Sequence, residues 1–224
     1  MATPRFGLLM PLTPLQTAFS HARLGRYLNW SNGDPDAALQ LYTLNAKLSE
    51  ALYIPLQALE LALRNRIHDA MRNRFGEEWL LDASECLSEK QVQKVRRALV
   101  EVSLNRKPHT SEQVLSTLSF GFWTALLGKE YEALWRETLY QIARKANGKR
   151  VPRKSLSGPL TTIRKLRNRI AHHEPILYYN LPRHHADIRQ IISWLSPEAE
   201  QWCAGCDRFP ALYQANPCQL PIAA

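Results

Sequence analysis

The sequence predicts an all-α fold, a helical bundle with short connections. Hydrophobic content of 45% and charged content of 22% in 224 residues allow a globular domain with a sizeable core. Capping signals precede the apolar runs, and no stretch shows the alternation of β-branched residues that is typical of strands. Within the runs apolar residues recur at helical spacing, as they do at Leu59, Leu63, Ile67 and Met71.

Helix starts are indicated by polar capping residues that precede a proline or stand three positions before a Glu or Gln. These residues are Thr13, Asp34, Ser88, Thr110 and Ser196. Glycine readily adopts the left-handed conformation that ends helices, so we expect helices to stop at Gly76 and Gly148. Pro55 lacks a backbone N–H and is expected to kink or divide the pattern that runs from Pro35 to Phe75.

Two further apolar faces are expected in the second half of the chain. They consist of Leu160, Ile163, Leu166 and Ile170, and of Ile188, Ile191, Ile192 and Leu195. The connection from about Asn147 to Gly158 is expected to be the least structured internal segment, and the tail after about Phe209 to be irregular. We expect a single domain over residues 1–224, with its core at about 34–202.

Hydropathy and cysteine content favour a cytoplasmic protein without a membrane partner. No apolar run approaches the roughly 20 residues of a membrane span. The apolar patch near the N-terminus is broken by Pro11 and Pro14, and it lacks the core and cleavage site of a signal peptide. Four cysteines in a chain of this length do not form a disulfide framework.

The positive charge of the chain is concentrated in one segment. From Thr138 to His173 there is no Asp or Glu, while ten Lys and Arg residues occur. The rest of the chain holds 19 basic and 20 acidic residues, so the net charge of +9 arises here. Such a concentration is typical of a surface that binds a polyanion, although a solvated basic surface is the simpler alternative.

The pentamer Leu-Arg-Asn-Arg-Ile occurs twice, at 63–67 and at 166–170, and a histidine follows each copy. After the second copy, Pro175 disfavours helical backbone at the residue before it. We therefore expect this helix to end near His172 or His173.

Three residues at this helix end suit the cleavage of a phosphodiester, namely Arg167, Asn168 and His172. Metal-free cleavage of RNA needs a base for the 2′-hydroxyl, an acid for the leaving 5′-oxygen and cationic donors for the phosphorane. Histidine titrates near neutral pH, and arginine offers bidentate donors to phosphate oxygens. Asn168 and His172 share a helix face. Arg167 and His172 lie about 140° apart around an ideal helix, which permits a contact between them without requiring it.

The stretch 166–176 resembles the signature of the Abi-like (abortive infection) family, which belongs to the HEPN superfamily of helical RNA-cleaving domains. That signature is an Arg, four to six residues and a His, often with a polar residue directly after the Arg. Arg167, Asn168 and His172 match it. Three other segments resemble the family's first helical pair and its middle helices, and these lie at 41–71, 114–127 and 131–135.

The resemblance implies an HEPN-like helical bundle with additional flanking helices. It implies a homodimer whose two motifs form one composite active site, and a metal-independent endoribonuclease that needs no cofactor. The implied role is phage defence or the toxin of a toxin–antitoxin pair, with RNA as substrate and an antitoxin or regulatory protein as a further partner. Arg167 and His172 are then the catalytic pair, Asn168 is the polar companion, and His173 has a supporting role.

Cations of the acid-free segment are expected to dock the RNA backbone. They are Lys149, Arg150, Arg153, Lys154, Arg164, Lys165 and Arg169. In the first pentamer, Glu60 and Arg64 are i,i+4 neighbours, and so are Arg64 and His68. We interpret Glu60–Arg64 as a structural salt bridge, with a supporting role of Arg64, in which it positions RNA, as the alternative. We expect Asn65, whose amide can orient neighbouring groups, to lie near the site as a supporting residue.

Two other functions are compatible with the motif. Some members of the superfamily only bind RNA or protein, so a non-catalytic binding module is the main alternative. A metal-dependent hydrolase that uses His172, His173 and Glu174 is a third interpretation. Helical metal ligands usually stand three or four residues apart, so this spacing does not favour a metal.

Two residue patterns outside the motif have a structural and a functional interpretation. Phe120, Phe122 and Trp123 could stack bases, but we expect them in the core. Cys203 and Cys206 have half of a zinc-binding spacing, which Cys218 and the His184-His185 pair could complete only by folding back. Ordinary helical cysteines are the preferred interpretation.

Overall fold

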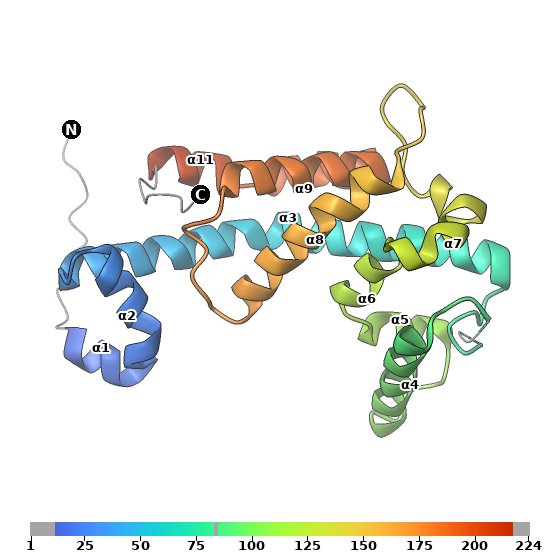
Figure 1. Ribbon diagram of the computed structural model, residues 1–224, viewed down its shortest axis with the longest axis horizontal. Coiled ribbons are helices and arrows are strands. Elements are labelled where there is room, and N and C mark those ends of the chain that lie inside the picture. Colours follow the sequence, from blue (N-terminus) through green and yellow to red (C-terminus); the bar gives the residue numbers. More distant parts are fainter. Residues whose placement is uncertain (1–11, 83–84, 217–224) are drawn as a thin grey trace. The chain divides into compact units, whose positions relative to one another are not determined.

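The computed structural model describes residues 12–82 and 85–216. Every regular element in these residues is a helix, apart from an isolated antiparallel bridge between Arg144 and Arg150, and this confirms the all-α prediction (Figure 1). Two short 3-10 helices are η2 (Lys129–Tyr131) and η3 (Leu139–Gln141). The α-helices are α1 (Leu12–Phe19), α2 (His21–Trp30), α3 (Pro35–Phe75), α4 (Glu89–Leu104), α5 (Ser111–Thr117), α6 (Phe120–Ala125), α7 (Glu132–Glu137), α8 (Arg153–Ala171), α9 (Leu181–Leu195), α10 (Pro197–Cys206) and α11 (Phe209–Ala215).

The chain divides into two compact units. Unit 1 combines the residues up to Leu52, the segment Asn168–Leu181 and the residues from Arg208 onward. Unit 2 combines Tyr53–Arg167 and Pro182–Asp207. Three helices contribute to both units, because α3 changes unit after Leu52, α8 after Arg167 and α9 after its first residue, Leu181. The expectation of a single domain over the whole chain stays a prediction.

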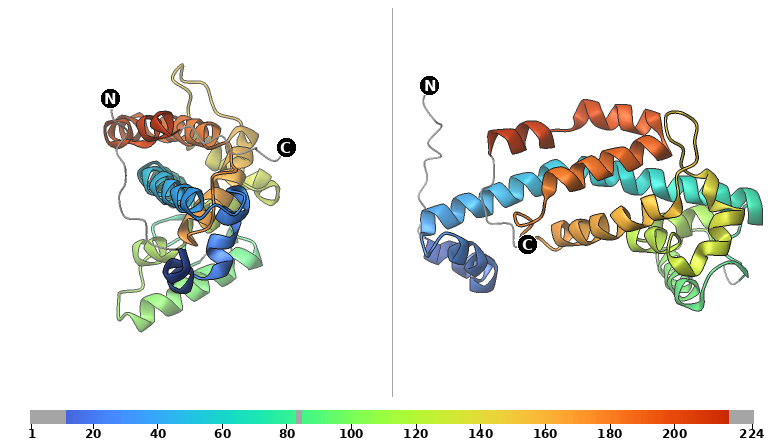
Figure 2. Two further views of the ribbon diagram at one scale, coloured as in Figure 1. Left: turned by 90° about the vertical axis from the view of Figure 1, so that its left-hand side faces the viewer. Right: turned by 45° about the horizontal axis from the view of Figure 1, so that its top comes forward.

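The core of unit 2 is formed by the apolar faces that the helical spacing predicts. The side chains of α3, α8 and α9 on these faces are at most 2% exposed. They are Leu59, Leu63, Ile67, Met71, Leu160, Ile163, Leu166, Ile188, Ile191, Ile192 and Leu195. In Figure 1 and Figure 2, α9 runs beside the unit 2 part of α3. Phe120, Phe122 and Trp123 are also buried, which confirms that they belong to the core.

Unit 1 has a core in which aromatic rings are prominent. Tyr27 of α2 is fully buried, and its ring meets the rings of Trp30 and Tyr42 edge-on, with 5.4 Å between the centroids in each pair. Asn45 of α3 is buried as well, and its side-chain oxygen accepts a hydrogen bond of 2.7 Å from the backbone N–H of Ile176. This bond ties the segment that follows α8 to the first part of α3.

Most of the expected helix starts are confirmed. The Asp34 carboxylate accepts hydrogen bonds from the backbone N–H groups of residues 36 and 37, and α3 begins at Pro35. Thr110 and Ser196 cap α5 and α10 in the same way. Helix α4 begins directly after Ser88, but its expected capping box does not form. The Ser88 hydroxyl instead lies 2.9 Å from the hydroxyl of Tyr131.

Two expected breaks in helices are absent. Helix α3 is not divided at Pro55, because buried Leu52 and Leu56 on either side favour a continuous helix. Gly148 does not end a helix. It has a φ of 75° and lies in a turn, in which its N–H donates to the carbonyl of Lys145 at 2.8 Å.

Two segments that were expected to lack regular structure are partly helical. Helix α8 begins at Arg153, so the second half of the segment 147–158 is helical. The tail after Phe209 is helical as far as Ala215, because a proline in the first turn of a helix is well tolerated. Residues 217–224 lie outside the described part of the chain. Among the described residues, no helix is both long and apolar enough to cross a bilayer.

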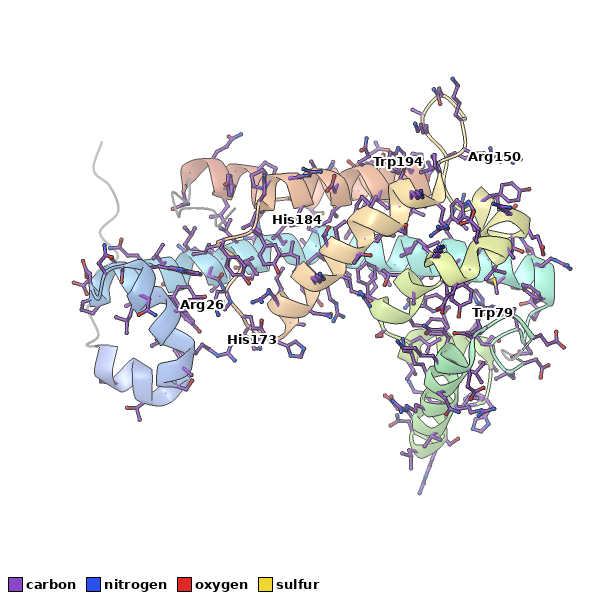
Figure 3. The ribbon with its side chains drawn as sticks, in the orientation of Figure 1. Arg26, Trp79, Arg150, His173, His184 and Trp194 are labelled. Carbon is purple, nitrogen blue, oxygen red and sulfur yellow. The ribbon has the colours of Figure 1, made fainter. Side chains whose placement is uncertain are left out.

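His68 is a buried polar residue of unit 2, with 8% of its surface exposed. Its Nδ1 accepts a hydrogen bond of 3.0 Å from the indole N–H of Trp79, which is labelled in Figure 3. Burial lowers the pKa of His68 below the ordinary value of 6.5, because desolvation disfavours the charged imidazolium.

We expect the free energy of unfolding to fall as the pH drops below about 6.5, because the unfolded chain then binds a proton that folded His68 does not. Trp79→Phe should lower this free energy by about 1–3 kcal/mol, since Nδ1 loses its donor. His68→Leu combined with Trp79→Phe should reduce the pH dependence. Urea unfolding at several pH values measures both effects. If the free energy of unfolding depended equally on pH in the wild type and the double variant, the role of His68 in the pH dependence would be contradicted.

Candidate functional site

Helix α8 ends in a turn that determines the backbone at the motif histidine. Three backbone hydrogen bonds close it, from His172 N–H to Asn168 C=O (2.9 Å), from His173 N–H to Ile170 C=O (3.0 Å) and from Glu174 N–H to Arg169 C=O (2.8 Å). The last two bonds form the Schellman pattern, which terminates many helices. The predicted helix end near His172 is therefore confirmed.

His173 takes the left-handed position of this turn, with a φ of 55°. Glycine is the usual residue there, because a β-carbon in left-handed backbone costs roughly 1–2 kcal/mol. Pro175 follows two residues later and prevents the helix from continuing. The strained backbone conformation is therefore adjacent to His172, the histidine that matches the motif.

Arg23 of α2 holds the carbonyl groups of this turn. Its Nη1 donates to the carbonyl oxygen of His172 at 3.1 Å and to that of His173. A cation at a helix C-terminus is stabilising, because the last carbonyls carry partial negative charge. Arg23 could not be predicted from the sequence, since it lies 149 residues before His172 and no local pattern connects the two.

The motif residues that belong to unit 1 face solvent. Asn168, His172 and His173 are all exposed, and Figure 3 shows His173 at the end of α8. The backbone hydrogen bond between Asn168 and His172 continues the helical geometry, so these two residues share one face as the spacing predicts. An exposed imidazole at a helix end is accessible to a large substrate.

Arg169 makes several contacts within unit 1. Its Nε donates to the hydroxyl of Tyr179 at 3.1 Å, and its Nη1 lies 2.9 Å from Glu174 Oε2. The guanidinium also lies 5.3 Å from the ring centroid of Tyr178. These contacts position the segment after α8. Arg169 therefore has a structural role in addition to its predicted contact with RNA.

Arg167, the motif arginine, belongs to unit 2 and faces an acidic partner there. Its Nη2 lies 3.5 Å from Glu60 Oε2 of α3, with 37% of the arginine side chain and 23% of the glutamate side chain exposed. The expected Glu60–Arg64 salt bridge is therefore wrong. The Nε of Arg64 instead donates to Asn65 Oδ1 at 3.1 Å. Spacing along α3 allowed the local pair, but α8 supplies Glu60 with a partner from a distant part of the chain.

The first pentamer copy serves the packing of unit 2. His68, which follows it, is buried against Trp79 and does not share a solvent-facing surface with Arg64. Arg66 Nε donates to the carbonyl of Ile142 at 3.3 Å. The two copies of the same five residues therefore have different surroundings, one beside the core and one at an exposed helix end.

The cations predicted to dock RNA fall into two groups. Lys149, Lys154 and Lys165 are exposed, and so is Arg150, whose guanidinium lies 4.2 Å from the ring centroid of Tyr140. Arg153 is held inside unit 2, with 11% of its side chain exposed and contacts of 2.7 Å to Glu132 Oε2 and to the carbonyl of Leu127. Arg153 is therefore a structural anchor of the α8 N-terminus.

The cysteine pair Cys203–Cys206 and the histidine pair His184–His185 do not form a metal site in the described residues. Burial raises the pKa of the Cys203 thiol to about 11, so this group stays protonated at neutral pH. Cys206 is exposed on the same helix, and Cys218 lies outside the described residues. His185 Nε2 is 2.5 Å from Asp207 Oδ2. In residues 12–82 and 85–216 no three His, Cys, Asp or Glu side chains gather closely enough to hold a metal.

Comparison with protein families gives one informative match. Residues 13–178, which include the motif and the turn after α8, match the model of the Abi-like protein family. No curated protein and no solved structure matches the chain. The matched range covers more than half of the sequence.

Arg23→Ala should loosen the turn after α8, because two carbonyls lose their shared donor. We expect a loss of roughly 0.3–1 kcal/mol in the free energy of unfolding, the usual size for a cation at a helix end. Amide exchange at His173 and Glu174 should become faster. Arg26→Ala, a change on the same helix, is the control. Equal exchange rates at the turn in both variants would contradict this role for Arg23.

Proposed function

Because the chain belongs to the Abi-like protein family, we propose that it acts in abortive infection or as a toxin, as a metal-independent endoribonuclease of the HEPN type. The observation that carries this proposal is the exposed His172 at the end of α8, preceded by Arg167 and Asn168. Histidine can transfer protons, arginine can stabilise the charge of the phosphorane, and asparagine can orient the reacting groups.

In the proposed reaction, the 2′-oxygen of a ribose attacks the adjacent phosphorus while a base takes its proton. The bond from phosphorus to the 5′-oxygen then breaks, and that oxygen receives a proton. The products are a 2′,3′-cyclic phosphate and a free 5′-hydroxyl. His172 takes part in proton transfer, Arg167 donates to the phosphorane oxygens, and Asn168 orients the reacting groups.

The reaction requires a base and an acid, and we propose that two protomers supply them. A homodimer would bring a second His172 to a composite site. The exposure of His172 supports this arrangement, since an exposed side chain remains available to a partner. Measurement of the solution mass by light scattering tests the dimer, and a strict monomer that cleaves RNA would exclude the composite site.

The alternative function is a module that binds RNA or protein without cleaving it. One observation favours it. Glu60 lies beside Arg167 and neutralises part of the charge that a phosphorane would need. In the catalytic proposal, the RNA phosphate displaces Glu60 from Arg167. A partly exposed ion pair with a separation of 3.5 Å is worth about 1 kcal/mol, so this exchange is not costly.

His172→Ala should reduce RNA cleavage by about 10²- to 10⁴-fold, the usual contribution of general acid–base catalysis. Cleavage of total RNA and of tRNA in EDTA, followed by analysis of the product ends, measures this effect. Circular dichroism shows whether the variant folds. Wild-type activity in the variant would refute the assignment of His172, and loss of wild-type activity in EDTA would refute the metal-free mechanism.

Glu60→Gln should tighten RNA binding by about two- to fivefold, because a carboxylate worth up to about 1 kcal/mol no longer competes with phosphate for Arg167. Glu50→Gln is a matched control, since Glu50 also lies on α3 and pairs with Arg208 at 2.7 Å. A general charge effect would tighten binding equally in both variants. Such a result would contradict a specific competition at Arg167.

A further inference from the structure

A hollow in unit 2, none of whose lining residues belongs to the motif, lies between α4 and the segment that joins α5 to α6. Its volume is about 170 Å³. This is well above the roughly 10–15 Å³ that a single water needs. Lys94 and Arg97 of α4 line one wall, and Ser119 lines the other, with the buried ring of Phe122 also among the lining residues.

A third cation, Arg164 of α8, lies next to this hollow. A β-carbon built on Gly121 would stand 3.8 Å from Arg164 Nη1 and 3.6 Å from Ser119 Oγ. The Arg164 guanidinium and the Ser119 hydroxyl therefore both lie next to Gly121. Burial and the positive charges of Lys90 and Arg164 lower the pKa of Lys94, and the nearby carboxylate of Glu130 offsets part of this effect. Lys94 and Arg164 are therefore close enough to repel each other.

The cations of the hollow are not neutralised by ion pairs. In the described part of the chain, Lys94, Arg97 and Arg164 have no carboxylate partner at ion-pair distance. Arginines elsewhere, such as Arg96 and Arg136, do have one although they are more than 60% exposed. Glu101 is the acidic residue among the lining residues, so positive charge is in excess there.

The chemistry of the hollow suits a tetrahedral oxyanion. Arginine and lysine donate charge-assisted hydrogen bonds to phosphate oxygens. Ser119 precedes α6 but its hydroxyl makes no capping bond to that helix, so it is available as a further donor. Arg164 also belongs to the acid-free segment that is predicted to dock RNA, so the hollow adjoins that segment.

We propose that this hollow binds a backbone phosphate of the RNA, at a subsite separate from the motif residues. The proposal rests on the proposed function for its ligand, because it names RNA as the source of the phosphate. Lys94, Arg97 and Arg164 neutralise the phosphate, and Ser119 donates to one of its oxygens. The subsite positions the strand and takes no part in bond cleavage.

The test is RNA affinity, measured by fluorescence anisotropy with a labelled single-stranded RNA. The full chain carries His172→Ala in every sample, so that the RNA stays intact. Lys94→Gln and Arg97→Gln should each weaken binding about three- to tenfold. The plot of log affinity against log salt has a negative slope, and each variant should make this slope less steep by about 0.7. This is the value expected for one lost phosphate contact on a single strand. Arg96→Gln is the matched control on α4 and should change the affinity less than twofold.

A second pair of variants adds charge and removes none. Ser119→Glu places a carboxylate in the hollow and should weaken RNA binding at least as much as Arg97→Gln. Ser116→Glu adds the same charge at an exposed position of α5 and is the control. Unchanged affinity and salt slope in both Arg97→Gln and Ser119→Glu overturn the proposal, and so does an equal loss in Ser116→Glu.

The outcome for this subsite can be separated from the outcome for catalysis. RNA binding that depends on Arg97 and Ser119, in a protein whose wild type never cleaves RNA, supports the subsite and refutes the ribonuclease. Titration with inorganic phosphate distinguishes a site for RNA phosphate from a site for free anions. If phosphate binds in a manner that depends on Arg97 while RNA does not bind, the hollow takes free anions and the RNA proposal is overturned.

Discussion

Pro175 prevents α8 from continuing, and the local geometry of the motif histidine depends on where this helix stops. The chain turns through a Schellman motif whose left-handed position is filled by His173. This arrangement leaves the His172 carbonyl at the helix end, where Arg23 binds it. The His172 side chain remains on the face that also carries Asn168. A proline, a strained residue and a distant arginine together fix the backbone from which the proposed catalytic group extends.

The contacts of the arginines distinguish structural cations from cations that are available to a ligand. The window from Thr138 to His173 contains no acid, yet three of its arginines have carboxylate partners. Glu132, Glu60 and Glu174 come from outside the window and pair with Arg153, Arg167 and Arg169. Charge counted along the sequence therefore overestimates the charge that RNA would meet. The lysines of the window and Arg164 account for much of what remains.

Sequence patterns predicted the features that are governed by neighbouring residues. Helical spacing identified the buried faces of α3, α8 and α9, and Asp34 and Thr110 cap helices as expected. Predictions failed where tertiary packing competes with local preference. Pro55 does not divide α3, because buried leucines on both sides stabilise the continuous helix. The role of Arg23 and the partner of Glu60 could not be predicted, since both depend on contacts between distant segments.

The left-handed backbone at His173 has a consequence for recognising related sequences. At this position the backbone determines which residues are acceptable, and glycine, asparagine and aspartate adopt a positive φ at the lowest cost. A chain with Gly or Asn after the motif histidine would keep the same turn, whereas a β-branched residue would disfavour it. A search pattern for this helix end should therefore require the arginine, the first histidine and the proline, and should accept glycine, asparagine or aspartate in place of the second histidine.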